Sequence, residues 1–475
     1  MTNNQLSAWK HESDHPTGVA EERVLKGSTL TEGYYQKTDQ PPVIFFRDSS
    51  NGNVFGIDKT TLYKNILLTG GAGSGKTNVL NQMLFWLRSE HTRTTLSENG
   101  TSDGVYIIFD TKADYYNHPK FFCTGDLCVG NSKNFRQKSA IWNVFEEVLA
   151  DGEDPRDYEA NAREIARVLF ADRGSKSQPF FANAARDIFS TVIIYMIRRS
   201  KDNPVPWKGK LNNKFLKDFL LSKPAVELSR YFSIYPDMRG IISYFGDGSS
   251  RQSLGVFGEL HQMIYDCFQG VFAEESPNNE YFSIRKAVRQ KQNRAIFVEY
   301  DMSVGESMTP MYRLLIDLAL KEALSEFANG RVHLFLDELK LLPKLSHLQD
   351  ALNFGRSKKV SVIAGIQNVN QLYSSYGESG AKEILEGFGT VFAFKANDHA
   401  TREYISHRYG PNLIAYRYYT AGNQPVDRDR EGYTVEEWHQ RVLPVGRAVV
   451  GLASQDQPFL FQFEPDPLIN TTKEY

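Results

Sequence analysis

The sequence has 475 residues, of which 41% are hydrophobic and 24% are charged, so it is long enough for two or three globular domains. The formal net charge of −2 excludes a strongly basic protein, and any contact with nucleic acid would need a local basic surface. The three cysteines form no cluster with histidines at metal-ligand spacing, which favours reduced thiols in a cytoplasmic protein.

The first part of the chain is predicted to begin with an arm and to continue as strands and a helix. Residues 1–40 are polar without periodicity, so we interpret them as an N-terminal arm, and they lack the apolar segment of a signal peptide. The elements expected next are a hairpin at 41–58 with an Asn-Gly turn, a strand at 64–70, a helix at 77–91 and a buried strand at 104–112 that contains Asp110 near its end.

The segment 145–275 has apolar residues at helical spacing and little strand signal. We therefore expect an all-helical domain inserted into the rest of the chain. Its most apolar stretch, residues 188–197, is about half the length of about twenty residues that a helix needs to span a bilayer.

Strands and helices alternate again after residue 276, which predicts a mostly parallel sheet covered on both faces. The expected elements are strands at 294–301, 333–338, 360–367 and 389–396, helices at 308–328 and from about 346, and a terminal hairpin at 447–465. The polar residues 466–475 are interpreted as a C-terminal tail.

Residues 70–77, GGAGSGKT, fit the phosphate-loop pattern G-x-x-x-x-G-K-[ST] and stand between a predicted strand and a predicted helix. Small residues let backbone N–H groups surround phosphates, and the helix N-terminus adds partial positive charge. Lys76 would reach the β- and γ-phosphates, and Thr77 would offer its hydroxyl to Mg²⁺. The predicted nucleotide-binding residues are Gly70, Gly71, Ala72, Gly73, Ser74, Gly75, Lys76, Thr77 and Asn78.

The loop predicts that the α/β part of the chain binds a nucleoside triphosphate. The nucleotide-binding domain would comprise residues 41–144 and 276–465, interrupted by the helical domain at 145–275. The loop alone does not separate a kinase, a GTPase switch and a translocating motor.

Asp337 and Glu338 directly follow four mostly apolar residues and fit a Walker B site. In such a site the first acid binds Mg²⁺, and the second acts as general base towards the attacking water. The alternative is a solvated strand end, which a phosphate loop in the same chain makes less favourable. Asp110 also ends an apolar strand, but no second acid follows it, so we rank it as a secondary candidate.

Two further polar residues complete the candidate catalytic set. Gln367 ends the next apolar strand, where an amide can contact the γ-phosphate or the water. Arg356 precedes that strand and could reach the nucleotide of a neighbouring subunit. The alternatives are a solvated strand end for Gln367 and an ordinary surface arginine for Arg356.

Several motifs in order resemble the type IV coupling proteins of conjugation and type IV secretion, of the TraD/TraG type within the HerA/FtsK superfamily. They are LLTGGAGSGKTNVL, YIIFDTKADYY, FFANAARDIFSTVIIYM, the long stretch from FLDELKLLPKL through GRSKK and GIQN to QLYSSYG, and VFAFKANDHATREYISHRYG. The resemblance runs from about residue 60 to about residue 465. Its most diagnostic stretch contains, in this order, the acid pair, the sequence GRS, a strand ending in IQ, and the sequence QLYSSYG.

The resemblance implies an α/β fold: a RecA-like P-loop NTPase domain with a mostly parallel central sheet and an inserted all-α domain. It implies ATP and Mg²⁺ as cofactors, a homohexameric ring with ATP at subunit interfaces, and single- or double-stranded DNA in the channel. Lys76, Thr77, Asp337 and Glu338 match the family's site, Gln367 its strand-end glutamine and Arg356 its candidate finger. The chain departs from the family in showing no N-terminal membrane helices, so a membrane-anchored partner could recruit it, alongside a relaxase.

Basic residues suitable for a DNA backbone occur in two short segments. They are Arg285, Lys286, Arg289, Lys291 and Arg294 in residues 283–294, and Arg356, Lys358 and Lys359 in residues 356–359. Solvated helix faces are the alternative for both segments, so no individual DNA contact is assigned.

Three hypotheses about function follow. The first is a DNA-translocating ATPase that couples DNA to a secretion machinery. The second is an adaptor that binds ATP and recruits a relaxase, an effector or a membrane partner, although the acid pair argues against a pure binder. The third is a soluble HerA/FtsK-like pump in DNA processing or defence, which the sequence does not separate from the first.

Overall fold

The computed structural model describes most of the chain, and its contacts divide it into two compact units. The described residues are 19–28, 30–32, 40–89, 104–118, 121–173, 179–245, 248–278, 280–328, 330–419 and 424–465. The first unit comprises Met1–Ser102, Phe335–Lys340 and Ser361–Tyr475, and the second comprises Asp103–Leu334 and Leu341–Val360. The predicted tail at 466–475 lies outside the described residues, as do residues 1–18 of the predicted arm.

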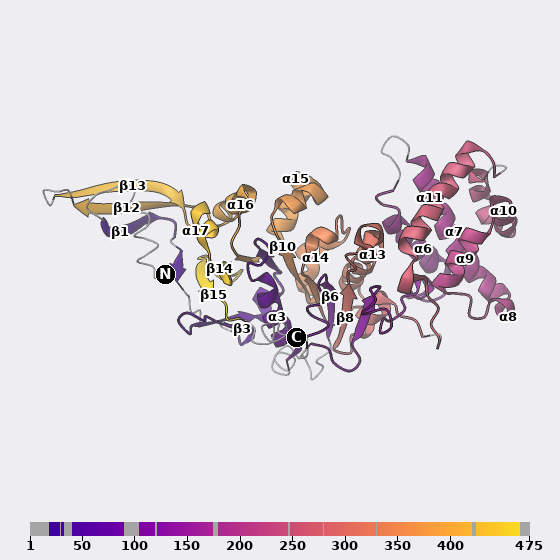
Figure 1. Cartoon of the computed structure of the whole chain (residues 1–475), viewed down its shortest axis with the longest axis horizontal. Coiled ribbons are helices and arrows are strands. Elements are labelled where there is room, and N and C mark those ends of the chain that lie inside the picture. The colour runs from indigo at the N-terminus through magenta and orange to yellow at the C-terminus, as the bar shows by residue number, and fades with distance from the viewer. Residues whose placement is uncertain are drawn as a thin grey trace. The chain divides into compact units, whose positions relative to one another are not determined.

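The first unit is built on strands in the order β2-β15-β14-β11-β5-β10. Figure 1 labels three of them, β15, β14 and β10. Strand β5 (Ile66–Thr69) is buried throughout and pairs in parallel with β10 (Val360–Ile366) and β11 (Thr390–Ala393). Strands β14 (Arg447–Gly451) and β15 (Phe459–Gln462) are antiparallel, which confirms the predicted terminal hairpin, and β2 (Thr31–Glu32) joins β15.

A second hairpin of this unit packs its aromatic residues into the core. Strands β3 (Pro42–Arg47) and β4 (Val54–Asp58) pair antiparallel around the Asn-Gly turn, as predicted. Phe55 contacts Phe461 edge-on at a ring-centroid distance of 4.6 Å, and Phe46 contacts Phe463 at 5.2 Å. The helices of the unit are α2 (Lys59–Leu62), α3 (Lys76–Arg88), α15 (Asn370–Glu386), α16 (His399–Tyr409) and α17 (Glu437–Val442).

A small sheet of three antiparallel strands corrects the prediction of an arm without regular structure. Strand β1 (Val19–Lys26) pairs with β12 (Pro411–Tyr419), which pairs with β13 (Pro425–Tyr433). The sheet was missed because β13 alternates acids and bases rather than apolar and polar residues. Cross-strand ion pairs such as Arg417–Asp427, at 2.8 Å, stabilise such a strand instead.

The second unit contains four strands of the ten-stranded sheet, in the order β9-β6-β8-β7. Strand β6 (Gly104–Asp110) is buried over its whole length and pairs with β8 (Arg294–Glu299), which also pairs with β7 (Leu127–Gly130). The register of β6 and β8 places Asp110 opposite Glu299. Strand β9 spans Arg331–Leu336, and its first four residues belong to this unit.

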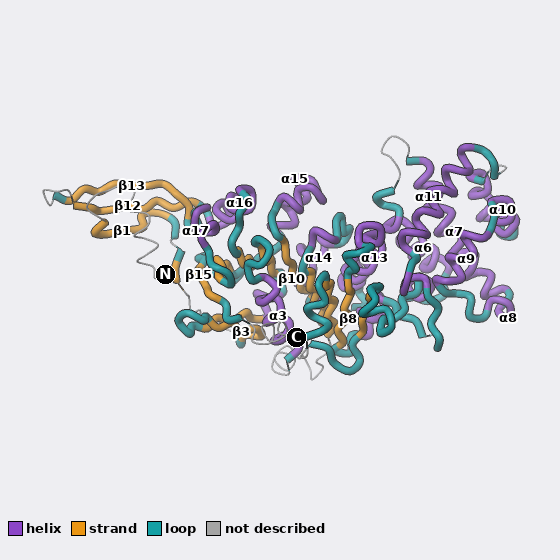
Figure 2. Tube along the Cα trace, in the orientation of Figure 1, coloured by secondary structure: helices purple, strands orange, loops and turns teal. Residues whose placement is uncertain are grey.

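Helices make up most of the second unit, and the described residues between 144 and 293 contain no strand (Figure 2). They are α5 (Val144–Val148), α6 (Pro155–Leu169), α7 (Phe180–Asp202), α8 (Pro204–Trp207), α9 (Asn213–Ser222), α10 (Ala225–Ser233), η1 (Pro236–Tyr244), α11 (Arg251–Cys267), η2 (Gly270–Ala273), α12 (Ile284–Gln290), α13 (Gly305–Leu324), α14 (Leu348–Phe354) and η4 (Gly355–Lys358). Helix α6 begins as its sequence indicates, because Asp154 accepts a hydrogen bond from the Arg156 backbone N–H and Pro155 occupies the first turn.

Helix α7 combines length with an apolar composition. Its 23 residues make it the one described helix long and apolar enough to cross a membrane by length and composition. However, 72% of its most apolar window is buried within the protein, as in the core helix of a globular unit. The helix therefore gives only weak support for a membrane span.

Candidate nucleotide-binding site

The phosphate loop lies between β5 and α3, as predicted. Its backbone turns through conformations that favour glycine, with φ of 71° at Gly73 and 112° at Gly75. The side chain of Lys76 folds back over the loop, and its Nζ donates to the carbonyls of Gly70 and Gly71 at 2.5 and 3.1 Å. Lys76 is 8% exposed, and its ammonium is held against the backbone that would surround phosphates.

The N-terminus of α3 is suited to an anion. The helix has thirteen residues, its N-cap is Gly75 without a side-chain cap, and its first turn contains no acidic residue. The helix dipole and the first backbone N–H groups consequently favour a negative ligand there. The side chain of Asn78, also predicted to bind the nucleotide, has a partner within the protein, because its Nδ2 donates to the Glu464 carbonyl at 2.9 Å.

The acid pair follows β9 directly and packs closely against β10. Asp337 is 6% exposed, and a Cβ added at Gly365 would lie 2.2 Å from the Asp337 carbonyl oxygen. A residue with a side chain at position 365 would therefore displace the backbone of the acid pair. The absence of that side chain lets the two strand ends meet.

The structure brings the predicted base and the predicted sensor into contact. Gln367 Nε2 donates a hydrogen bond to Glu338 Oε2 at 2.8 Å. The other carboxylate oxygen, Glu338 Oε1, is buried and has no hydrogen-bond partner among the described residues. Because a buried oxygen without a partner is costly, this atom is placed to accept a proton or hydrogen bond from a bound molecule.

Sequence reasoning missed Gln371, which holds the backbone of the sensor. Its Oε1 accepts from the Gln367 backbone N–H at 3.1 Å, and its side chain is mostly buried. The loop between them is also fixed by Thr401, whose hydroxyl accepts from the Val369 N–H at 3.0 Å. A glutamine four residues after a strand end is the one signal that could have indicated this contact.

The polar groups of this region fit Mg²⁺ and a nucleotide. The oxygen atoms predicted as ligands belong to Thr77 and Asp337, and the hydroxyl of Ser74 is buried without a partner among the described residues. Oxygen ligands suit Mg²⁺, which keeps several waters and shares substrate phosphates. Accordingly, no group of three or more His, Cys, Asp or Glu in the described chain forms a metal cage by itself.

Asp110 and Arg356, the other two predicted residues, belong to the second unit. Arg356 lies in η4 and is exposed, as a residue that acts on another subunit would be. Asp110 is fully buried at the end of β6, and its carboxylate accepts from the backbone N–H groups of Lys112 and Tyr115 at 3.0 and 2.9 Å. Burial raises the pKa of Asp110, although these N–H groups oppose the shift.

Glu299 is a second buried acid that the sequence prediction missed. It ends β8 opposite Asp110 and is 3% exposed. Burial, and then the charges of Asp110 and Asp114, raise the pKa of Glu299 to about 9. Glu299 is therefore protonated at neutral pH.

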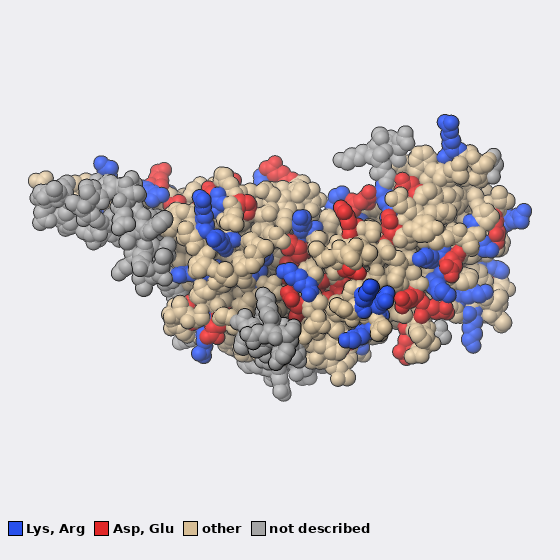
Figure 3. All heavy atoms as spheres, in the orientation of Figure 1, with Lys and Arg blue, Asp and Glu red and all other residues tan. Residues whose placement is uncertain are grey.

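The predicted basic segment 283–294 is divided between the interior and a cavity. Arg285 and Arg289 form ion pairs with Asp151 and Glu322 at 2.5 to 3.1 Å, which fixes α12 to α13. Lys291 is 1% exposed. These three are therefore part of the internal packing, and on the face seen in Figure 3 basic and acidic side chains are interspersed.

A strand, a glycine-rich loop and a helix, with an acid pair and a glutamine at neighbouring strand ends, define a P-loop NTPase. The family model described as "Type IV secretion-system coupling protein DNA-binding domain" matches residues 50–440. The chain belongs to this family, which confirms the resemblance in the sequence.

Known relatives agree with this assignment. Coupling protein TraD of Escherichia coli (strain K12) is 23% identical over 440 residues, covering 90% of this chain and 52% of TraD. The chain spans about half the length of the curated relatives it matches. The solved structure of the unbound bacterial conjugative coupling protein TrwBdeltaN70 has a TM-score of 0.69 at 18% identity and covers 95% of both chains. TrwB in complex with ADP and Mg²⁺ has a TM-score of 0.65 at 18% identity and covers 96% of both. These likenesses confirm the RecA-like α/β fold.

Proposed function

We propose that the chain is an ATP-hydrolysing DNA translocase that couples a DNA or nucleoprotein substrate to a type IV secretion machinery. The observation that carries the proposal is Glu338, one of whose oxygens is fixed by Gln367 while the other is buried and has no partner among the described residues. A protein that only bound ATP would not need an oriented carboxylate with an open oxygen. The family description and the bound ADP and Mg²⁺ of TrwB support DNA and a nucleotide as ligands.

Each residue of the site has a distinct role in the proposed reaction. Lys76 would move from the loop carbonyls to the β- and γ-phosphates of a bound nucleotide, and Thr77 and Asp337 would hold Mg²⁺, which would supply charge neutralisation there. Glu338 Oε1 accepts a proton from the attacking water, whose oxygen bonds to the γ-phosphorus as ADP leaves. Gln367 orients both Glu338 and the water.

The wider assembly is part of the same proposal. Six copies form a ring, Arg356 contacts the nucleotide of a neighbour, and DNA occupies the channel. Residues 41–144 and 276–465 form the nucleotide-binding domain, with 145–275 as the inserted helical domain. The ring works in the cytoplasm and is recruited to the inner face of the membrane by an anchored partner, where a relaxase delivers the substrate.

The experiment is to measure ATP binding and ATP hydrolysis of Glu338→Gln with and without single- and double-stranded DNA. We expect unchanged ATP affinity and a loss of DNA-stimulated turnover of about 10²- to 10⁴-fold, the usual contribution of a general base. Glu386→Gln, an exposed position on α15, is the matched control and should keep wild-type turnover. Retained turnover in Glu338→Gln overturns the assignment, and a wild-type rate that neither DNA stimulates favours an adaptor.

The ring is tested by mixing two inactive variants. If Arg356 acts across an interface, Lys76→Ala and Arg356→Gln subunits should each be inactive alone but should regain part of the activity when mixed. That recovery arises because some interfaces then combine an intact loop with an intact arginine. A mixture as inactive as its components assigns Arg356 to the surface of its own subunit.

A further inference from the structure

A cavity of about 490 Å³ lies within the second unit, where β7 and β8 begin and α12 passes them. Its walls include Leu127, Glu280, Phe282, Lys286, Gln290 and Arg294. Two members of the predicted basic segment, Lys286 and Arg294, thus face a cavity, whereas their neighbours Arg285 and Arg289 are paired internally. The cavity belongs to neither the phosphate loop nor the acid pair.

The positive charge of Arg294 has no ion-pair partner among the described residues. Its Nη2 donates to the neutral side-chain oxygen of Gln292, and its Nε is buried without an acceptor among the described residues. No carboxylate in that part of the chain forms an ion pair with it. A guanidinium left in this state favours an incoming carboxylate, which it can bind through two parallel hydrogen bonds.

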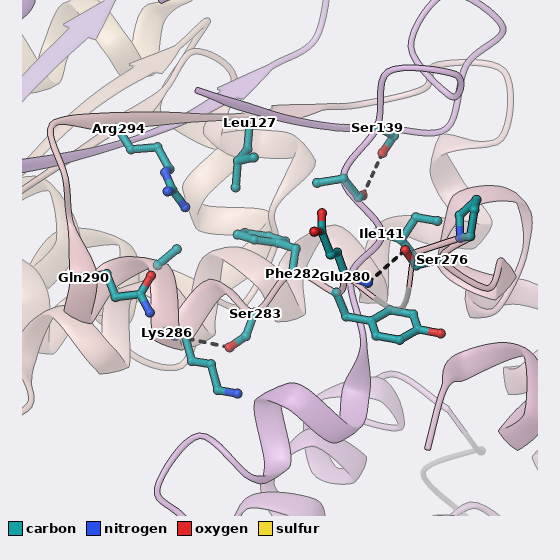
Figure 4. A pocket seen from close by; sticks show the side chains of 14 residues that line it. Leu127, Ser139, Ile141, Ser276, Glu280, Phe282, Ser283, Lys286, Gln290 and Arg294 are labelled. Atoms are coloured by element: carbon teal, nitrogen blue, oxygen red, sulfur yellow. Dashed lines mark hydrogen bonds between the residues drawn. The ribbon is translucent and has the colours of Figure 1, made fainter. Parts of the chain in front are cut away.

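The opposite side of the cavity has the opposite charge. Figure 4 shows Glu280 and Arg294 reaching towards the cavity from different sides, with the ring of Phe282 between them. Glu280 is exposed, and its backbone N–H donates to Ser276 Oγ at 3.1 Å, which fixes the position of the acid. Lys286 is already paired with Glu146 and so adds little free charge.

The floor of the cavity is apolar and rigid. The Phe282 N–H donates to the Ile141 carbonyl at 2.8 Å, and the Asn143 N–H donates to the Phe282 carbonyl at 3.1 Å, so this segment is fixed on both sides of the ring. Leu127 and Ala287 extend the apolar surface. A preformed wall of this kind lowers the entropic cost of binding.

We propose that this cavity binds a short peptide segment of a protein partner, with an acidic side chain against Arg294, an apolar side chain on Phe282 and a basic side chain near Glu280. The charges favour a peptide over nucleic acid, because Glu280 would repel a phosphate backbone and one unpaired arginine is a small basic surface for a polyanion. The size of the cavity fits a few side chains. The site does not depend on ATP hydrolysis.

The experiment measures binding of fluorescent acetylated and amidated hexapeptides to the full chain by anisotropy. The probes contain Glu-Leu-Lys within a Gly-Ser background, and the comparison peptides carry Lys-Leu-Lys, Glu-Leu-Glu or Glu-Ser-Lys at the same positions. We expect the first peptide to bind at least tenfold more tightly than the others. Arg294→Gln should abolish that preference, whereas Arg251→Gln, an exposed arginine on α11, should keep it.

A charge reversal tests the other end of the cavity without touching the interior. Glu280→Lys should shift the preference from Glu-Leu-Lys to Glu-Leu-Glu, and because Glu280 is exposed this variant should fold even if Arg294→Gln does not. Equal binding of all peptides to the wild-type chain overturns the proposal. An oligo-dT that displaces the peptide, and whose affinity falls in Arg294→Gln, assigns the cavity to nucleic acid instead. ATPase activity should be unchanged in all variants, which separates this result from the proposed function.

Discussion

The two units each contain a pair of acids at strand ends, and the surroundings of the two pairs differ. Asp337 and Glu338 are consecutive on one strand, and Glu338 has an amide donor on one oxygen and no partner among the described residues on the other. Asp110 and Glu299 lie on neighbouring strands, and burial together with the charge of Asp110 raises the pKa of Glu299 to about 9. The comparison teaches that two acids buried side by side disfavour ionisation, as at Glu299, whereas a carboxylate with one amide donor and one open oxygen has the geometry that we propose for a general base.

The largest expected effect is on ATP turnover, when the glutamate of each pair is replaced by glutamine. Glu338→Gln should reduce ATP turnover by about 10²- to 10⁴-fold, because it removes the proton acceptor. Glu299→Gln should leave turnover nearly unchanged, because glutamine has the shape and neutrality that Glu299 already has at neutral pH. Steady-state ATPase rates with DNA present measure both variants. Similar losses in the two would mean that the pairs do not differ in the proposed way.

The next largest effect is expected where Gly365 packs against the backbone of Asp337. Gly365→Ala places a Cβ 2.2 Å from the Asp337 carbonyl oxygen, so the strand ends must separate. Overpacking of this kind costs about 1–3 kcal/mol, and we expect lower thermal stability together with reduced turnover. Gly258→Ala on α11 is the control, because nothing lies within 4 Å of the added Cβ. It should be neutral or slightly stabilising, and a Gly365→Ala variant that behaves like it would contradict the close approach.

The second pair, Asp110 and Glu299, should make the stability of the protein depend on pH. Because the pKa of Glu299 is raised in the folded state, its contribution is present below the unfolded value near 4.5 and is lost as pH rises towards about 9. Unfolding free energy should therefore fall with pH across this range, by at most about 1.4 kcal/mol per pH unit for one proton. Asp110 acts with the same sign, since burial also raises its pKa.

Denaturant unfolding at several pH values measures this slope. Residue 299 cannot titrate in Glu299→Gln, so the unfolding free energy of this variant should change less with pH than that of the wild type. The variant should be more stable than the wild type, and the difference should be largest at high pH. Identical slopes would show that Glu299 is already charged in the folded protein.

The sequence predicted the parts of the site whose chemistry depends on consecutive residues. The phosphate loop and the acid pair are such patterns, and the flanking strands and helix were found where expected. The contact of Gln367 with Glu338 depends on the register of strands far apart in the chain, so the sequence could suggest a shared role for the two residues but could not place them in contact. The same limit hid Glu299, whose partner Asp110 is on another strand.

Charge patterns were the least informative part of the sequence. The basic segment 283–294 suggested DNA contacts, but Arg285 and Arg289 meet Asp151 and Glu322, which no local pattern could identify as partners. The alternating charges of β13 likewise concealed a strand. In both cases a charged residue is placed by an ion-pair partner on another element, Asp151 and Glu322 for α12 and Arg417 for Asp427 of β13.

The smallest expected effect tests how the first pair is held. Gln371→Leu removes the acceptor of the Gln367 backbone N–H, whereas Gln371→Glu keeps an acceptor at that position. A buried N–H without a partner costs about 1–3 kcal/mol, part of which Gln367 can relieve by moving away from Glu338. We expect a several-fold lower kcat in the leucine variant with little change in KM, and recovery in the glutamate variant. Equal activity in both would show that the loop is held by Thr401 alone, whose hydroxyl accepts from Val369.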